Sequence, residues 1–259
     1  MSEPALRALP RLCFVHVPKT GGMAVTETLA KLYGPATCPA MTTLDYARYD
    51  TDSFAAYRFY RGHAYRRDYR RLPGDTRLLM ILRDPVRRAL SQYWYFRRLD
   101  QHDIGDPFMR EAIDVARTCS FTDFVHSDSP FVVEHVRLAQ VRQFLPQTLI
   151  DEIGHRQFLS RGMRRAVCDA FHDELSRFDA ALTTGWLPRS LPTALRDLGL
   201  RARLDLSLVN ATEPYPNSDY GDALRVLVDV NCAEFACYRM VADRERATMM
   251  QISATSLAA

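Results

Sequence analysis

The chain has 259 residues, of which 47% are hydrophobic and 25% are charged, and it contains 11 glycines and 14 prolines. These proportions are typical of a globular protein and exclude a disordered, collagen-like or fibrous chain. The net charge of +3 comes from 34 basic and 31 acidic residues, which excludes the strongly basic balance typical of nucleic-acid binding.

The first predicted element is a strand at residues 12–17, a short apolar run that ends at Pro18. Two glycines follow, and apolar residues then recur at helical spacing from Met23 up to Gly34, a typical helix stop. The chain is therefore predicted to begin with a strand, a loop and a helix.

Two further strands are predicted in the next part of the chain. The first, at residues 57–60, leads into His63, and the second, at residues 77–82, is followed by Arg83 and by a proline suited to the first turn of a helix. That helix is predicted over residues 86–99, where apolar and aromatic residues keep helical spacing.

The remaining sequence predicts more helices and one late strand. A capping box, Ser-Phe-Thr-Asp, begins at Ser120 after a polar segment at residues 100–118 that we expect to be irregular. Helices are predicted at residues 134–144, 160–175, 187–198 and 219–241, and a strand at residues 178–184. Residues 1–10 and 248–259 are expected to be flexible.

Strands that alternate with helices predict an α/β fold with a mostly parallel central sheet flanked by helices on both faces. No internal repeat or linker divides the sequence, so we predict a single domain over residues 1–259. Ligands of such sheets bind beyond the carboxyl ends of the strands. The loops at residues 18–22 and 83–85 are therefore expected to face the same crevice.

The loop at residues 18–22, Pro-Lys-Thr-Gly-Gly, has the composition of an anion-binding site. Free backbone N–H groups and the helix dipole attract negative charge where a strand leads into a helix. Glycine lets the backbone approach a ligand closely, while Lys19 offers a charge and Thr20 a hydroxyl. A surface turn with a solvated lysine is the alternative. Because the lysine precedes the glycines, a P-loop kinase or GTPase fits poorly.

The second loop adds groups that bind phosphate. Arg83 can hold a phosphate through two parallel hydrogen bonds, and Ser91, eight residues later, can donate a hydroxyl if the chain folds back. Taken alone, Arg-Asp-Pro is also the ordinary start of a helix with an internal salt bridge.

Three segments together resemble the sulfotransferases that use 3′-phosphoadenosine 5′-phosphosulfate (PAPS). Residues 14–22, F-V-H-V-P-K-T-G-G, look like their 5′-phosphosulfate loop, and residues 81–96, I-L-R-D-P-V-R-R-A-L-S-Q-Y-W-Y-F, resemble their 3′-phosphate motif. Residues 59–65, F-Y-R-G-H-A-Y, are similar to the segment with the catalytic histidine in the heparan sulfate 2-O-sulfotransferase and uronyl sulfotransferase family. The resemblance implies the P-loop-like nucleotide-binding α/β core of these enzymes.

The resemblance also implies a role for each matching residue. The 5′-phosphosulfate would be held by Lys19, Thr20, Gly21 and Gly22, and the 3′-phosphate by Arg83 and Ser91. His63 would act as the general base, and Lys19 would stabilise charge on the departing product, 3′-phosphoadenosine 5′-phosphate (PAP). No metal is required. The carboxylates Asp45, Asp50 and Asp52 are alternative bases. His16 is expected to lie within the first strand, either as a packed residue or as a residue that supports the site from behind.

Two positions depart from the family pattern. Where the family often has Thr-Ser after the glycines, this chain has Met23 and Ala24, and the hydroxyl of Thr26 can compensate. Two residues before the predicted base, Arg61 stands where the heparan enzyme has another histidine. The second departure implies that the acceptor chemistry differs.

The predicted reaction moves a sulfuryl group from PAPS to a hydroxyl of a carbohydrate or of another small or lipid-linked acceptor. A PAP- or PAPS-binding module without catalysis is the main alternative, and a nucleotide kinase is a third. Basic residues surround His63 in the sequence and would either attract an acidic glycan or form a solvated surface. Because the chain is rich in arginine throughout, the solvated surface is favoured. These residues are Arg61, Arg66, Arg67, Arg70 and Arg71.

We expect a cytoplasmic protein. No apolar run approaches the ~18 residues of a membrane-spanning helix, and the first ten residues lack the form of a secretion signal. The six cysteines include no C-x-x-C pair and are therefore expected to be reduced thiols. Lys19 and Lys31 are the only lysines among the 34 basic residues, a bias that favours a bacterial source.

Overall fold

The computed structural model describes residues 9–38, 46, 49, 51–100, 104, 106–156, 158–200 and 220–257. The chain divides into two compact units. The first comprises Met1–Arg83, His172–Thr212 and Arg239–Ala259, and the second comprises Asp84–Phe171 and Glu213–Tyr238. The prediction that residues 1–259 form one sulfotransferase domain stays a prediction.

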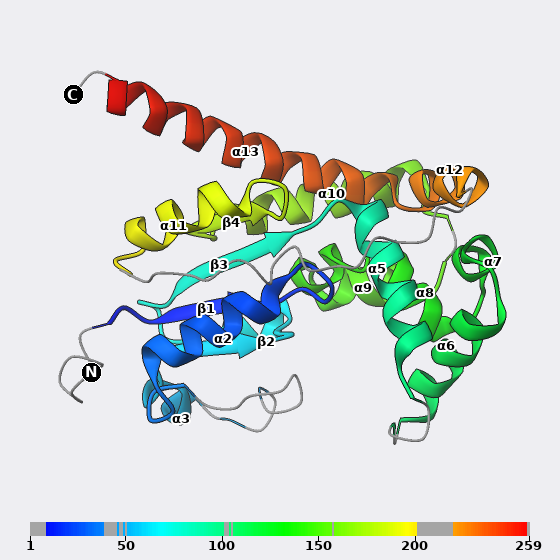
Figure 1. The fold of residues 1–259 in the computed structure, drawn as a ribbon, viewed down its shortest axis with the longest axis horizontal. Coiled ribbons are helices and arrows are strands. Elements are labelled where there is room, and N and C mark those ends of the chain that lie inside the picture. The colour runs from blue at the N-terminus through cyan, green and yellow to red at the C-terminus, as the bar shows by residue number, and fades with distance from the viewer. Residues whose placement is uncertain are drawn as a thin grey trace. The chain divides into compact units, whose positions relative to one another are not determined.

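The first unit contains the sheet that the sequence predicted (Figure 1). Its strands are β1 (Leu12–Val15), β2 (Phe59–Gly62), β3 (Arg77–Leu82) and β4 (Ala180–Thr183). All the strand pairs are parallel, and the order across the sheet is β2-β1-β3-β4. The predicted α/β class with a parallel central sheet is confirmed. The second strand starts two residues later than predicted and ends directly before His63.

Two helices of the first unit, α2 (Gly22–Tyr33) and α11 (Leu187–Asp197), pack on one face of the sheet. Phe14, Leu79 and Leu182 are buried on that face of neighbouring strands. Val25 of α2 and Leu191 of α11 belong to the same buried cluster. Burying these side chains supplies the main stabilisation of the unit, at roughly 1.5–3 kcal/mol for each large side chain. The apolar residues that recur at helical spacing in the sequence of α2 therefore form the buried face of that helix.

The short helix α4 (Arg66–Tyr69) is joined to α10 (Arg161–Leu175) through a buried carboxylate. Glu174 is 1% exposed and accepts hydrogen bonds from Arg66, Arg70 and the Tyr69 hydroxyl. Burial alone would raise the pKa of Glu174, but the hydrogen bonds and charges of Arg70 and Arg66 outweigh burial and lower it. The ionised carboxylate is therefore the form that the fold stabilises.

We expect Glu174→Gln to lower the free energy of unfolding by about 1–3 kcal/mol at pH 7, because a neutral amide replaces a charge-assisted acceptor. Since the folded state lowers the pKa of Glu174, its contribution is complete above the ordinary value of 4.5 and is lost as pH falls through the folded pKa. Urea unfolding at several pH values measures this. The exposed neighbour Asp173, changed to Asn, is the matched control, and an equal loss at neutral and acidic pH would contradict the assignment.

The second unit is helical in its described part (Figure 1). Its core combines buried residues of several helices, among them Phe96, Ile113, Phe124 and Leu227. Its helices are α5 (Pro85–Arg98), α6 (Pro107–Thr118), α7 (Phe121–His126), α8 (Pro130–Val136), the 3-10 helix η2 (Val141–Phe144), α9 (Gln147–Ile153), most of α10, α12 (Gly221–Val230) and the start of α13 (Cys232–Leu257).

Several predictions for this unit were wrong in detail. Residues 100–118 were expected to be irregular, but 107–118 form α6, whose polar residues face outward while Ile113 and Ala116 are buried. The predicted helix at residues 134–144 is interrupted, because Leu138 adopts a left-handed conformation with φ of 53°. The capping box is confirmed: the Ser120 and Asp123 side chains each bond to the other's backbone N–H.

The predicted terminal helix at residues 219–241 is two helices with Asn231 between them. The Asn231 side chain accepts from the N–H of Leu138 and donates to the carbonyl of Val136. The two helices are separate because the backbone at Asn231 departs from helical angles, with φ of −111° and ψ of 17°. Helix α13 then continues to Leu257, through residues that we expected to be flexible. None of the helices described is long and apolar enough to cross a membrane.

Candidate functional site

Three predicted site residues follow three adjacent strands of the first unit. Lys19 lies in the loop after β1, His63 directly follows β2, and Arg83 directly follows β3. Because β1 pairs with both of the other strands in parallel, all three residues leave the carboxyl edge of the sheet. This edge is where parallel α/β sheets bind ligands. The placement expected for the loops after β1 and β3 is therefore present.

The loop after β1 has an unusual backbone conformation. Lys19 has a φ of 68° and Gly21 a φ of 73°, both in the left-handed region. This conformation is strained for lysine but not for glycine. Thr20 is fully buried, and its hydroxyl donates to the carbonyl of Val17 at 2.9 Å. Thr20 thus closes the loop with its hydroxyl, which leaves backbone N–H groups to meet a ligand.

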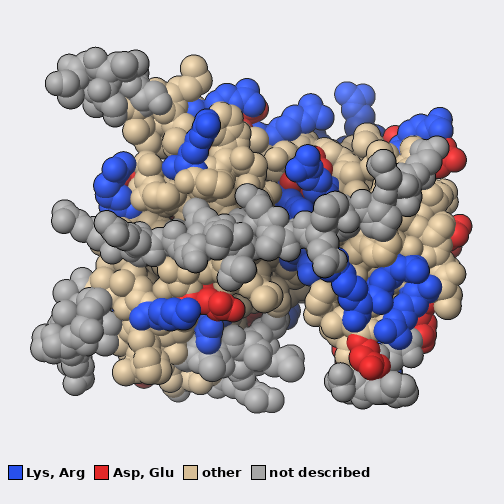
Figure 2. All heavy atoms as spheres, viewed as in Figure 1, with Lys and Arg blue, Asp and Glu red and all other residues tan. Residues whose placement is uncertain are grey.

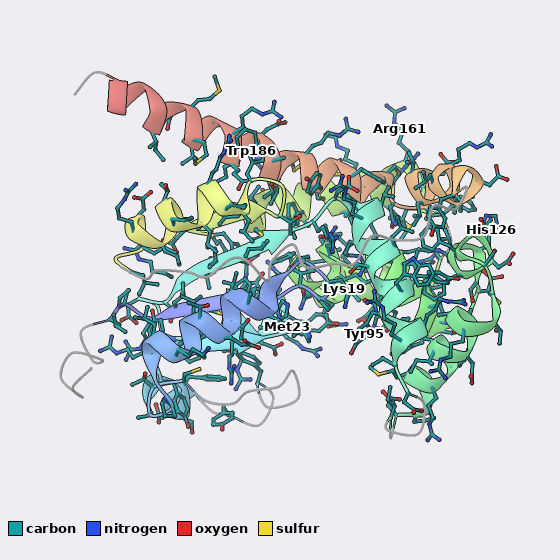
Figure 3. All side chains as sticks on the ribbon, viewed as in Figure 1. Lys19, Met23, Tyr95, His126, Arg161 and Trp186 are labelled. Atoms are coloured by element: carbon teal, nitrogen blue, oxygen red, sulfur yellow. The ribbon has the colours of Figure 1, made fainter. Side chains whose placement is uncertain are left out.

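Helix α2 begins immediately after this loop (Figure 3). Gly21 occupies the N-cap position and has no side chain with which to cap the first N–H groups. Met23, in the first turn of α2, is 69% exposed, so this turn lies at the surface. The start of α2 therefore presents backbone donors and a partial positive charge. Helix starts of this kind can bind anions, and the anion site at this one stays a prediction.

Gly22 is required by the packing of His16. A Cβ atom at Gly22 would lie 2.3 Å from Cδ2 and 2.6 Å from Nε2 of the His16 ring, and 3.0 Å from Cζ of Phe14. The rings of Phe14 and His16 are stacked with centroids 5.7 Å apart. The first turn of α2 therefore rests directly on the His16 ring, with no space for a larger residue. Sequence reasoning assigned Gly22 to the ligand and missed this contact.

The orientation of His63 is fixed by a hydrogen bond. Its Nδ1 atom lies 2.7 Å from the carbonyl oxygen of His16. A carbonyl can only accept, so Nδ1 must carry the proton, and the neutral ring then has its lone pair on Nε2. His63 is half-buried. The structure thus holds the tautomer that a general base needs.

His16 lies beside His63 but has different proton chemistry. The two ring centroids are 5.0 Å apart. Burial, together with the charges of His63 and Lys19, lowers the pKa of His16 to about 3 from 6.5. His16 is therefore neutral at physiological pH and places no charge beside His63. It directly follows β1 instead of lying within it, and it supports the site through its ring and its carbonyl.

Arg83 connects the loops after β1 and β3. Its Nη1 donates to the carbonyl of Lys19 at 3.2 Å. The next residue, Asp84, caps α5 by accepting from the N–H of Arg87, which confirms that this motif starts a helix. Ser91 lies two turns into α5 and is 8% exposed. Ser91 belongs to the second unit, so its place in a site shared with Arg83 stays a prediction.

The structure describes the remaining candidates unevenly. Thr26 has a buried hydroxyl oxygen with no hydrogen-bond partner among the described residues. Of the alternative bases, Asp45 and Asp50 lie outside the described residues, and Asp52 is exposed on the short helix α3 (Thr51–Ala55).

Most of the arginines near His63 make internal contacts. Arg66 and Arg70 bind Glu174, and Arg71 donates to the carbonyls of Tyr46 and Tyr49. Figure 2 shows basic side chains in several separate groups on the face drawn, some with acidic side chains beside them. These arginines therefore stabilise the fold, a role that was not included when they were predicted to attract an acidic glycan or to form a solvated surface.

Searches of protein-family models and of curated proteins return no match for this chain. The resemblance to PAPS-dependent sulfotransferases accordingly rests on the three motifs and on the placement of their residues. His16 is the site residue that sequence analysis undervalued. Its position between a buried strand and the loop with Lys19 could have indicated that it supports the site.

Proposed function

We propose that the protein is a PAPS-dependent O-sulfotransferase. The observation that carries the proposal is the placement of Lys19, His63 and Arg83 at the carboxyl ends of three adjacent strands. A positioned imidazole beside the cationic loop after β1 is suited to moving a proton from a hydroxyl while an anionic group departs. The three motifs that contain these residues resemble those of PAPS-dependent sulfotransferases, and this resemblance indicates PAPS as the donor.

The residues of the first loop fit a phosphosulfate. Backbone N–H groups at the start of α2 are available because Gly21 has no capping side chain. The orphaned hydroxyl of Thr26, one turn further along, would gain a partner from an anionic oxygen. Lys19 and these N–H groups would hold the 5′ end of the donor, and Arg83 its 3′-phosphate.

His63 would accept the proton of the acceptor hydroxyl at Nε2. In the neutral ring, the bond from Nδ1 to the His16 carbonyl leaves the lone pair on Nε2, and the same bond stabilises the imidazolium that forms when Nε2 takes the proton. When bound, PAPS supplies the sulfuryl group, whose sulfur forms a bond to the acceptor oxygen as its bond to the 5′-phosphate oxygen breaks. Lys19 and the loop amides would stabilise the charge left on that phosphate, an effect of about 10²–10³ in rate for one such donor.

Ligand binding and product formation test this proposal together. We expect PAP at 100 times its Kd to raise Tm by about 5–10 °C, and ATP with magnesium to have no comparable effect. Lys19→Ala and Arg83→Ala should abolish the shift. Lys31→Ala, which changes the chain's other lysine at the far end of α2, is the matched control.

The second arm incubates the protein with PAPS and a set of neutral and acidic glycans and detects sulfated product by mass spectrometry. Product from any of them supports the proposal. PAP binding without product from any acceptor would favour the binding module. Magnesium-dependent ATP turnover would favour a kinase and overturn the proposal.

A further inference from the structure

A cavity of about 220 Å³ lies in the first unit, along the open edge of β4. Its walls come from β4, α11 and the later part of α13, which lie side by side in Figure 1. Apolar lining residues include Ala180, Leu182, Ala194 and Met249. An apolar cavity of ~150 Å³ is known to bind benzene, so this volume suits a molecule with one substituted ring.

Glu245 presents an unsatisfied acceptor to this cavity. The residue is 3% exposed, and its Oε2 accepts from the backbone N–H and the hydroxyl of Thr183 at 3.0 and 2.6 Å. Its Oε1 is buried and has no hydrogen-bond partner among the described residues. The hydroxyl of nearby Ser190 donates to the carbonyl of Trp186 at 3.1 Å, and burial raises the pKa of Glu245 by more than the Ser190 and Thr183 hydroxyls lower it. A buried polar atom without a partner is costly, which makes Oε1 a natural point for a ligand donor.

The backbone of β4 adds a donor and an acceptor on the same side. The N–H of Thr184 donates to Leu82 of β3, whereas the N–H of Thr183 points the other way, to Glu245. Backbone groups alternate sides along a strand, so those of Ala181 point away from β3, like those of Thr183. Ala181 lines the cavity. Its N–H and C=O are therefore directed to the open edge, where a planar ligand can pair with both.

The residues that line the cavity carry two positive and three negative charges, and Arg196, beside the lining residue Asp197, offsets the third negative charge. Arg244 donates to the carbonyls of Leu175 and Phe178, both at 2.7 Å, and faces the same cavity as Glu245. At the rim, Arg77 and Asp179 form an ion pair, and the exposed Asp197 lies beside Arg196. A ligand with net charge would meet a like charge on one side. The balance favours a neutral molecule.

We propose that this cavity binds a small, neutral, planar molecule of the amide, lactam or nucleobase type. Its N–H group donates to Oε1 of Glu245, and its remaining donor and acceptor pair with the backbone of Ala181. The ring packs against Ala194 and Leu182. This inference does not rest on the proposed sulfotransferase activity, because none of the residues assigned to PAPS lines the cavity.

Benzamide is the probe. Benzoate is the control, because it has nearly the same shape but carries a negative charge and has no N–H donor. Titrations followed by saturation-transfer NMR should show saturable binding of benzamide in the millimolar range and at least about tenfold weaker binding of benzoate. Equal binding of the two, or no saturable binding of benzamide, would overturn the proposal.

Three variants locate the site. Glu245→Gln should weaken benzamide binding at least about tenfold, because the amide bonded to Thr183 turns an N–H group toward the cavity. Ala194→Leu fills the cavity and should abolish binding. Ala247→Leu, the same change at an exposed residue of α13 outside the lining, should leave it unchanged. If Glu245→Gln does not fold, the two alanine variants still decide the location, and unchanged binding in Ala194→Leu would contradict it.

Discussion

Replacing His63 with asparagine is expected to reduce the turnover of sulfuryl transfer by roughly 10²- to 10⁴-fold, the usual contribution of a positioned general base. The asparagine amide nitrogen can take the place of Nδ1 and donate to the His16 carbonyl, so the local fold should persist. What is lost is the lone pair on Nε2. His63→Ala, which lacks both nitrogens, should abolish transfer. Turnover and PAP affinity are measured on the same preparations.

PAP affinity separates catalysis from structure. Both His63 variants should bind PAP nearly as well as the wild type, because the residues assigned to the nucleotide lie in the other two loops. His172→Asn is the matched control, since the His172 side chain is 72% exposed in the same unit. Normal turnover in His63→Asn would remove His63 from the mechanism. Loss of PAP binding together with turnover would instead assign it a structural role.

Gly22→Ala is expected to lower the free energy of unfolding by roughly 1–3 kcal/mol and to abolish PAP binding. The added Cβ would lie 2.3 Å from the His16 ring, so either the ring or the first turn of α2 must move. Moving the ring disturbs its stacking on Phe14 and its contact with the His63 ring. Moving the helix displaces the N–H groups that would hold the phosphosulfate. Urea unfolding and PAP-dependent thermal shift measure the two effects.

The matched control for this variant is Gly185→Ala. Gly185 follows β4, and no atom lies within 4 Å of a Cβ added there. We expect a change within about 0.5 kcal/mol, as for ordinary surface substitutions. If the two alanine variants were equally stable and bound PAP equally well, the packing of His16 against the start of α2 would have no functional importance.

The strands and the loops after them were predictable because their signals are local. The run at β3, Arg-Leu-Leu-Met-Ile-Leu, is short, apolar and bounded by turn residues, and its predicted bounds match the structure. Each predicted loop residue then follows from the strand before it. Since parallel strands share one carboxyl edge, a parallel sheet places the loops with Lys19, His63 and Arg83 at the same edge, and the structure adds that their strands are neighbours.

The parts that could not be predicted depend on contacts between distant residues. Helix α12 ends at Asn231, whose side chain bonds to Val136 and Leu138 about 95 residues earlier, and helical periodicity cannot register such contacts. Likewise, the basic segment after His63 contains the partners of Glu174, more than 100 residues later. The tautomer of His63 depends on the carbonyl of His16, a group that the sequence does not distinguish from any other.

A crystal structure of the protein with PAP bound would test the proposed nucleotide site most directly. We predict the 5′-phosphate at the start of α2, within hydrogen-bond distance of the Lys19 side chain, and the 3′-phosphate on the guanidinium of Arg83. We also predict that Nε2 of His63 faces the space beyond the 5′-phosphate where an acceptor hydroxyl would enter. PAP bound at another edge of the sheet, or Lys19 and Arg83 both directed away from it, would contradict the proposed site.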